Sequence, residues 1–355
     1  MMITANHLTV LRVIILPLPY FLLYGGTWSR IAAICVFAAL GLTDYLDGLI
    51  ARRYGPTELG KLLDPIADKI FLAATLVPLV DLGVLPLWIV WTVFLREFLV
   101  TELRACLMDI HMDLPVTELA KIKTTIQMTV AGLVLLTDTF PDKFVTAAFL
   151  AGAFLATAFL AIGLYWRDGH LSQRIGIALA LLAFGLVLLA ALDTRTVILS
   201  YGFIMLAVTL ASGGRYLIAG LPSCLAKKAR AAPGIVLSLS VFLAALALAG
   251  SGRSLSGYVI LILSVGFTAQ GIDMWAFQTG KRDISAWWRY LAAPAALCAF
   301  AVLPALAGKG KGAALFLLIT LSLAFSYLVV DIWMHRTLFG GLFAKNPSHD
   351  HPRGD

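Results

Sequence analysis

Residues 43–69 read TDYLDGLIARRYGPTELGKLLDPIADK and follow the apolar run IAAICVFAALGL. The stretch places four carboxylates beside segments that are otherwise suited to lipid: Asp44, Asp47, Asp64 and Asp68. On a helix, the first two share a face with Gly48 and Ala51, and the last two share a face of the next helix. The connection is short and rich in glycine and proline. We therefore expect a tight helical hairpin in which the carboxylates converge across one interhelical gap.

Such a cluster needs compensating positive charge, because a single aspartate at the centre of a membrane helix costs about 3 kcal/mol on insertion scales. Divalent cations held by carboxylate oxygens would supply it, and Mg²⁺ keeps open positions for substrate phosphates. We predict two ions, Mg²⁺ or Mn²⁺, suited to displacement at phosphorus, with one carboxylate accepting the proton of the nucleophile. Gly48 and Ala51 leave room for a flat group, and Arg52 can bind phosphate oxygens. The alternative is that the aspartates pair with nearby cations, namely Arg52, Arg53, Lys61 and Lys69.

Composition indicates an all-α polytopic membrane protein, because 60% of the 355 residues are hydrophobic and only 13% are charged. A membrane span needs about 20 mainly apolar residues. This rule gives about twelve transmembrane helices: 8–25, 31–52, 65–81, 84–106, 122–139, 145–166, 174–192, 196–218, 231–250, 256–278, 288–307 and 313–334. The four cysteines are scattered singly, so neither a disulfide framework nor a CxxC metal site is indicated.

The distribution of basic residues predicts that both termini are cytoplasmic. With that orientation, the inside segments hold 21 of the 27 Lys and Arg residues, in agreement with the positive-inside rule. Basic loops favour the anionic lipids of the inner leaflet, so the net charge of +7 requires no nucleic acid partner. The four aspartates are then expected at the cytoplasmic face of a membrane, which we take to be a bacterial inner membrane.

The spacing of the aspartate stretch resembles the signature of the CDP-alcohol phosphatidyltransferase family. The matching pattern is Asp-x2-Asp-Gly-x2-Ala-Arg, seven residues, then Gly-x3-Asp-x3-Asp, which begins at Asp44 and ends at Asp68. The resemblance implies a membrane enzyme with a six-helix core that transfers the phosphatidyl group of a CDP-linked donor to an alcohol and releases CMP. It implies metal ligation by the four aspartates and a catalytic base at Asp68. Contacts to the CDP donor are implied for Asp47, Gly48, Ala51, Arg52 and Gly60.

Two further stretches resemble the bacterial phosphatidylglycerophosphate synthases of that family. Residues 6–12 match an Asn-x-Leu-Thr-x2-Arg pattern, and residues 95–127 resemble an Arg-Glu-Phe segment followed by Lys-x-Lys-Thr-x2-Gln. Four cations flank the intervening loop and would suit a phosphorylated acceptor: Arg96, Arg104, Lys121 and Lys123. The competing account is binding of inner-leaflet lipids. The chain departs from the usual Ser-Gly before the second arginine, where Glu102 adds a negative charge.

We predict a six-helix catalytic domain at 1–170, an additional six-helix region at 171–340 and a polar tail at 341–355. Helix 196–218 looks more like the closing helix of the family, so a core interrupted by an inserted hairpin is an alternative. The second half is open to roles in lipid handling, homodimer formation or partner binding. The predicted reaction passes the phosphatidyl group of CDP-diacylglycerol to glycerol 3-phosphate. The alternatives are a cardiolipin-synthase-like or other transferase with a different acceptor and, outside enzymes, a twelve-helix transporter.

Overall fold

The computed structural model describes residues 5–54, 58–112, 118–140, 142–226 and 256–278, together with single positions between 239 and 249. Every regular element in these ranges is helical, as expected for apolar segments whose backbone groups must be satisfied within the segment. The longer elements are α1 (Ala5–Ile15), α3 (Thr27–Tyr54), α4 (Glu58–Asp81), α5 (Leu87–Asp109), α6 (Glu118–Thr139), α7 (Lys143–Asp168), α8 (Gln173–Ala191), α9 (Thr194–Arg215) and α12 (Ser256–Gln278). The shorter ones are α2 (Pro17–Leu22), the π-helix η1 (Tyr216–Gly220) and α10 (Leu221–Ala226).

Helices lie at the positions of the first eight predicted spans and of the span at 256–278. One correction concerns the first span, which divides into α1 and α2 because Pro17 lacks the backbone N–H needed to continue the helix. The predicted spans at 231–250, 288–307 and 313–334 lie wholly or largely outside the described residues. The total of twelve transmembrane helices and the cytoplasmic location of both termini therefore stay predictions.

Three helices of the described part are long and apolar enough to cross a membrane. They cover Lys143–Arg167, Gln173–Ala191 and Thr194–Cys224. The exposed surface agrees with a lipid environment, since Phe144, Phe159 and Trp166 on α7 are each more than 80% exposed. Large apolar side chains left outside a packed core indicate contact with lipid or with another protein surface. The coarse prediction of a helical membrane protein is thus supported.

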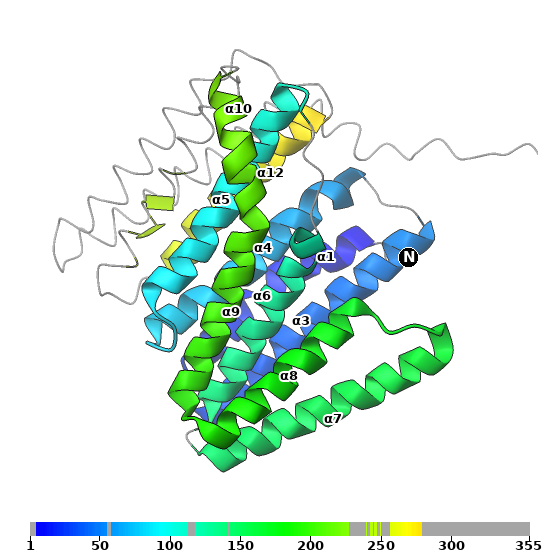
Figure 1. Ribbon diagram of the computed structural model, residues 1–355, viewed down its shortest axis with the longest axis vertical. Coiled ribbons are helices and arrows are strands. Elements are labelled where there is room, and N and C mark those ends of the chain that lie inside the picture. The colour runs from blue at the N-terminus through cyan, green and yellow to red at the C-terminus, as the bar shows by residue number, and fades with distance from the viewer. Residues whose placement is uncertain are drawn as a thin grey trace, which may run out of the picture.

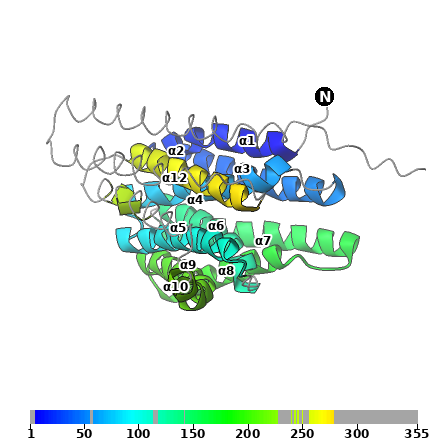
Figure 2. The same ribbon diagram turned by 90° about the horizontal axis from the view of Figure 1, so that it is seen from above.

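The bundle is layered (Figures 1 and 2). Viewed from above, α1, α2 and α3 lie on one side and α9 and α10 on the other, with α4, α5, α6 and α12 between them. Helix α1 packs against both α3 and α4, and α12 packs along α4 and α5. Helices α7 and α8 form a hairpin at one side of the bundle. The last described helix is thus placed beside the helices of the predicted catalytic domain, although it is remote from them in sequence.

Helix α9 lies inside the same core as the N-terminal helices. It packs most extensively against α6 and also against α5, whereas α7 packs mainly against α8. Gly213 permits a close approach, because a Cβ there would lie only 2.9 Å from Arg96 Nε. A Cβ at Gly202 would likewise lie 3.2 Å from a side-chain carbon of Leu85 and 3.3 Å from one of Ile89. The packing therefore joins α9 to the N-terminal helices, although the α7–α8 hairpin separates them in the sequence.

Candidate active site

Both helices of the predicted hairpin are present, and their packing against each other stays a prediction. Helix α3 continues to Tyr54 and α4 begins at Glu58, so only a short connection separates them. Because α3 is helical throughout residues 44–54, positions 44, 47, 48 and 51 lie on one side of its backbone. The side chains of Asp44, Asp47, Ala51 and Arg52 fall outside the described part, and their predicted roles stay predictions.

The other two aspartates lie one turn apart near the beginning of α4. Asp64 is exposed and Asp68 is half-buried, so both can be reached by a ligand. Gly60, one turn before Asp64, is buried in the helix packing. The carboxylates project where α4 packs against α1, and α1 packs in turn against α3. This arrangement places α1 at the gap in which the four predicted ligands were expected to meet.

Two residues of α1 contact these carboxylates. Thr9 Oγ1 donates a hydrogen bond of 3.0 Å to Asp64 Oδ1. Arg12 Nη1 forms a 3.4 Å ion pair with Asp68 Oδ1. The Arg12 side chain is only 2% exposed, and a buried guanidinium of this kind requires an ionic or hydrogen-bonded partner. Helix α1 therefore orients the carboxylates of α4 from one side.

Thr9 and Arg12 belong to the sequence pattern of residues 6–12, but they are not among the site residues that the sequence predicts. The available signal was Arg12 itself, a charged residue inside an apolar run. A charge within a membrane span is expensive and is usually paired and functional. That reasoning could have predicted a carboxylate partner for Arg12. The identity of the partner required the packing of α1 on α4.

The residues present are suitable for a divalent cation. Carboxylate oxygens are the ligands that Mg²⁺ and Mn²⁺ prefer, and two accessible carboxylates one turn apart supply them. Among the residues whose side chains are described, no group of three or more His, Cys, Asp or Glu side chains is close enough to hold a metal ion. Two of the four predicted ligands, Asp44 and Asp47, are not among these residues. Metal binding therefore stays a prediction.

A second carboxylate, Glu97 on α5, forms the centre of a buried ionic cluster. Its Oε1 accepts a 2.6 Å hydrogen bond from Lys123 Nζ on α6 and a 3.2 Å bond from Arg96 Nη1. Gln127 Nε2 donates to the same oxygen over 3.4 Å. All three charged residues are between 5% and 7% exposed. We call these four residues the Glu97 cluster: Arg96, Glu97, Lys123 and Gln127.

Helix α9 completes the Glu97 cluster. Arg96 Nη2 donates to Ser212 Oγ over 3.0 Å, and Ser212 Oγ in turn donates to the carbonyl oxygen of Thr209. Gln127 Nε2 donates to Thr209 Oγ1 over 2.9 Å. The hydrogen bonds therefore connect α5, α6 and α9. A cluster of this kind fixes the relative positions of the three helices, because a broken contact would leave a buried charge poorly satisfied.

The structure separates the four cations predicted to bind the acceptor phosphate. It brings Arg96 and Lys123 together, but both already bind Glu97 and both are buried. Arg104 is half-buried, and its guanidinium lies 4.8 Å from the centre of the Tyr216 ring. Its Nε is buried without a hydrogen-bond partner among the described residues. The side chain of Lys121 is outside the described part.

One contact connects the two carboxylate regions. Lys69, which follows Asp68 on α4, donates a 2.7 Å hydrogen bond to Thr101 Oγ1 on α5. Thr101 Oγ1 donates to the carbonyl oxygen of Glu97 one turn earlier. Lys69 Nζ also lies 5.3 Å from the ring centre of Phe267 on α12. The sequence suggested Lys69 as a partner for the aspartates; this hydrogen bond directs it toward α5.

Fold and site together define a helical membrane protein that carries two accessible carboxylates, Asp64 and Asp68, near the beginning of α4. Residues 2–164 match the family described as CDP-alcohol phosphatidyltransferase. Over 136 residues the chain is 34% identical to the CDP-diacylglycerol–glycerol-3-phosphate 3-phosphatidyltransferase of Rickettsia typhi, covering 37% of this chain and 75% of the relative. The chain belongs to the CDP-alcohol phosphatidyltransferase family.

Other relatives match the same part of the chain. A probable phosphatidylglycerophosphate synthase of Mycobacterium tuberculosis is 40% identical over 139 residues, which make up 37% of this chain. The match spans 65% of that relative, somewhat less than two thirds of its length. The CDP-diacylglycerol–glycerol-3-phosphate 3-phosphatidyltransferase of Escherichia coli is 35% identical over 128 residues, or 34% of this chain and 70% of the relative. No solved structure matches the chain.

Proposed function

We propose that the protein transfers the phosphatidyl group of CDP-diacylglycerol to glycerol 3-phosphate and releases CMP. The observation that carries the proposal is the pair Asp64 and Asp68, accessible on α4 and held by Thr9 and Arg12 of α1. These carboxylates occupy the last two acidic positions of the family signature. The printed names of the Rickettsia typhi and Escherichia coli relatives support the same donor and acceptor. Family membership also favours an enzyme over a transporter.

In the proposed reaction, a hydroxyl oxygen of glycerol 3-phosphate forms a bond to the phosphorus that carries diacylglycerol. The bond from that phosphorus to the oxygen bridging the pyrophosphate breaks, and CMP leaves with the bridging oxygen. Asp68 takes the hydroxyl proton, a role in which a positioned carboxylate contributes about 10²- to 10⁴-fold to the rate. Arg12 fixes the position of Asp68 through their 3.4 Å contact.

Two divalent ions, Mg²⁺ or Mn²⁺, would be held by Asp44, Asp47, Asp64 and Asp68. When bound, they would neutralise the phosphate oxygens of the donor. Gly48, Ala51, Arg52 and Gly60 would contact the CDP group, as the family signature implies. We place this site at the cytoplasmic face of a bacterial inner membrane, on the basis of the positive-inside distribution of basic residues.

For the acceptor phosphate, Arg104 is the candidate that the described contacts favour. Its buried Nε has no hydrogen-bond partner among the described residues, and a phosphate oxygen would satisfy such a donor. Arg96 and Lys123 would have to give up Glu97 in order to bind a phosphate directly. We therefore assign those two cations to the framework around the acceptor region. Ser212 of α9 binds Arg96, so we also infer that α9 belongs to the catalytic domain.

The deciding experiment measures CMP release by the purified full chain with CDP-diacylglycerol and Mg²⁺ or Mn²⁺. The acceptor panel consists of glycerol 3-phosphate, glycerol, inositol phosphate and phosphatidylglycerol. We expect release with glycerol 3-phosphate and little with the others. Release with phosphatidylglycerol alone would instead indicate a cardiolipin-synthase-like reaction. The absence of CMP with every acceptor and both metals would refute the enzymatic proposal.

A further inference from the structure

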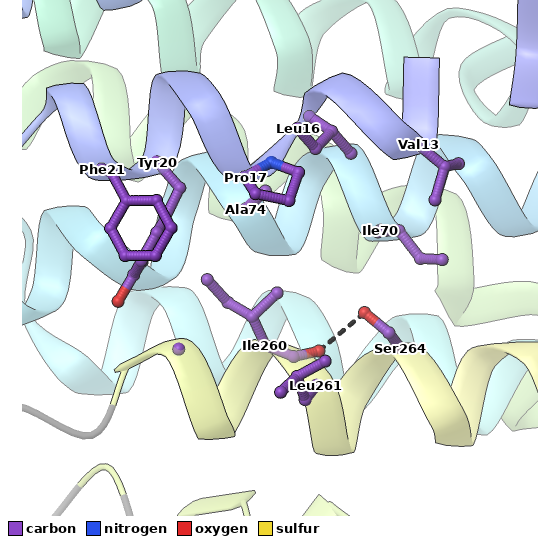
Figure 3. A pocket seen from close by; sticks show the side chains of 11 residues that line it. Val13, Leu16, Pro17, Tyr20, Phe21, Ile70, Ala74, Ile260, Leu261 and Ser264 are labelled. Atoms are coloured by element: carbon purple, nitrogen blue, oxygen red, sulfur yellow. Dashed lines mark hydrogen bonds between the residues drawn. The ribbon is translucent and has the colours of Figure 1, made fainter. Parts of the chain in front are cut away.

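An apolar groove of about 550 Å³ runs between three parts of the bundle (Figure 3). Residues of α1 and α2 line one wall, Ile70 and Ala74 of α4 form the floor, and α12 forms the opposite wall. The polar side chains in the lining are bound within the protein. Ser264 Oγ donates to the carbonyl oxygen of Ile260, and Tyr20 shares a 2.9 Å hydrogen bond with Ser256. The space between the walls is therefore apolar.

One end of the groove adjoins the proposed active site. Val13 follows Arg12 directly on α1, and Ile70 lies two positions after Asp68 on α4. From there the lining continues along α1 and α2 to Phe21, about 12 Å farther at roughly 1.5 Å per residue. The far end is close to Ser256, which bonds with Tyr20 and with Asp81 at the end of α4. The groove thus leads from the carboxylates along the length of α4.

We propose that the groove binds one acyl chain of the lipid donor and that α12 supplies one of its walls. This inference rests on the proposed function, which places the phosphate of the donor beside Asp64 and Asp68. A linear hydrocarbon chain fits a narrow apolar channel that begins at the phosphate. A docked helix of the same length is too large, since a cylinder about 10 Å wide occupies on the order of 1,000 Å³.

The groove depends on α12 for one of its walls. Residues 256–278 lie outside the segment matched by the family, yet α12 packs along α4 and places Leu261 and Ser264 in the groove. Ser256, the first residue of α12, hydrogen-bonds with Tyr24, which follows α2, and with Asp81 at the end of α4, and these contacts fix the beginning of α12. The C-terminal half therefore contributes to the donor site and determines how strongly long acyl chains are preferred.

The test fills the groove and compares donors of different chain length. Ser264→Trp and the smaller filling Ala74→Leu are assayed for CMP release with dioctanoyl and dipalmitoyl CDP-diacylglycerol. We expect each variant to raise the KM for the dipalmitoyl donor about tenfold relative to the dioctanoyl donor, which corresponds to the burial of about two methylene groups. Ile14→Trp is the matched control, because Ile14 is 67% exposed on α1 and lies outside the groove. Equal effects on both donors in both variants would overturn the proposal.

A second measurement does not depend on turnover. CDP-diacylglycerol with a diazirine at the end of one acyl chain is cross-linked to the full chain in detergent, and the labelled peptides are identified by mass spectrometry. We expect labels within 13–21 and 257–264 in the wild type and the loss of these labels in Ser264→Trp. Labelling without CMP release would refute the proposed reaction and leave the groove supported. CMP release with labels elsewhere, or equal labelling by a diazirine phosphatidylcholine, would refute the groove as a donor site.

Discussion

The apolar helices α4 and α5 both carry carboxylates: Asp64 and Asp68 on α4, and Glu97 on α5. On each helix, one of these carboxylates is paired with a cation. Asp68 binds Arg12 and Glu97 binds Arg96 and Lys123. Their surroundings differ, because Asp64 is exposed and Asp68 half-buried, whereas Glu97 is only 5% exposed. Asp64 binds Thr9 and Asp68 binds Arg12, both on α1, whereas Glu97 binds side chains of α5 and α6.

This difference in exposure favours a catalytic role for the α4 carboxylates and a structural role for Glu97. A carboxylate that binds metal ions or takes up a proton has to be reached by them, and the α4 pair can be. Glu97 is enclosed by its partners, so an incoming phosphate would have to displace a buried carboxylate from two cations, at a high cost in free energy. Carboxylates in similar apolar helices therefore have different predicted roles. Substitution of Asp68 should mainly affect catalysis, and substitution of Glu97 should mainly affect stability.

Asp68→Asn should have the largest effect on catalysis. The amide is similar in shape but cannot take the hydroxyl proton, so we expect kcat for CMP release to fall about 10²- to 10⁴-fold. The thermal unfolding midpoint in detergent should change little, because the amide oxygen of Asn can still accept the hydrogen bond that Arg12 Nη1 donates to Asp68. Asp138→Asn is the control, since Asp138 pairs with Arg30 away from the α4 carboxylates. Near-normal CMP release by Asp68→Asn would remove its role as the base.

Glu97→Ala should have the largest effect on stability. It would leave Arg96 and Lys123 buried without their shared carboxylate, and breaking a buried pair in this way costs about 3–5 kcal/mol. We expect a large fall in the thermal unfolding midpoint. The double variant Glu97→Ala, Lys123→Met should recover part of the loss, because it removes one of the unpaired charges. Unchanged stability with selective loss of glycerol 3-phosphate turnover would instead place Glu97 in the acceptor site.

The aspartate stretch allowed much of the fold around α3 and α4 to be predicted from the sequence. Apolar length predicted the helices, and the short segment after Tyr54 predicted their close connection. The break at Pro17 was missed because hydropathy does not change there. Helix α12 was predicted as a span, but its place beside α4 could not be, since nothing local in an apolar helix specifies its neighbour.

The candidate site was predictable where a spacing pattern existed and not where partners came from distant helices. Lys123 was identified as a cation near a phosphate, but its burial against Glu97 depends on how α6 packs on α5 and α9. Ser212 gave no signal, because a serine in an apolar helix commonly bonds its own backbone. It bonds the Thr209 carbonyl in that way and also accepts a hydrogen bond from Arg96.

Arg104→Gln should separate the acceptor from the donor. If its guanidinium binds the acceptor phosphate, the loss of a charged hydrogen bond costs about 1.5–3 kcal/mol, or roughly 10- to 100-fold in the KM for glycerol 3-phosphate. The KM for CDP-diacylglycerol should change little. Arg104→Lys keeps the charge but loses the planar group facing Tyr216, so an intermediate effect is expected. Equal changes in both KM values would contradict the assignment to the acceptor.

Ser212→Ala should produce the smallest effect and tests whether α9 supports the Glu97 cluster. The variant removes the 3.0 Å hydrogen bond to Arg96, and we expect a loss of about 1 kcal/mol in the free energy of unfolding. Ser200→Ala is the matched control on the same helix, because Ser200 Oγ bonds only the backbone of Thr196 in the described contacts. Equal losses in the two variants would mean that the contact with Arg96 adds nothing to stability. A greater loss for Ser212→Ala, reduced when Arg96→Met is also present, would show that α9 and α5 are coupled through this pair.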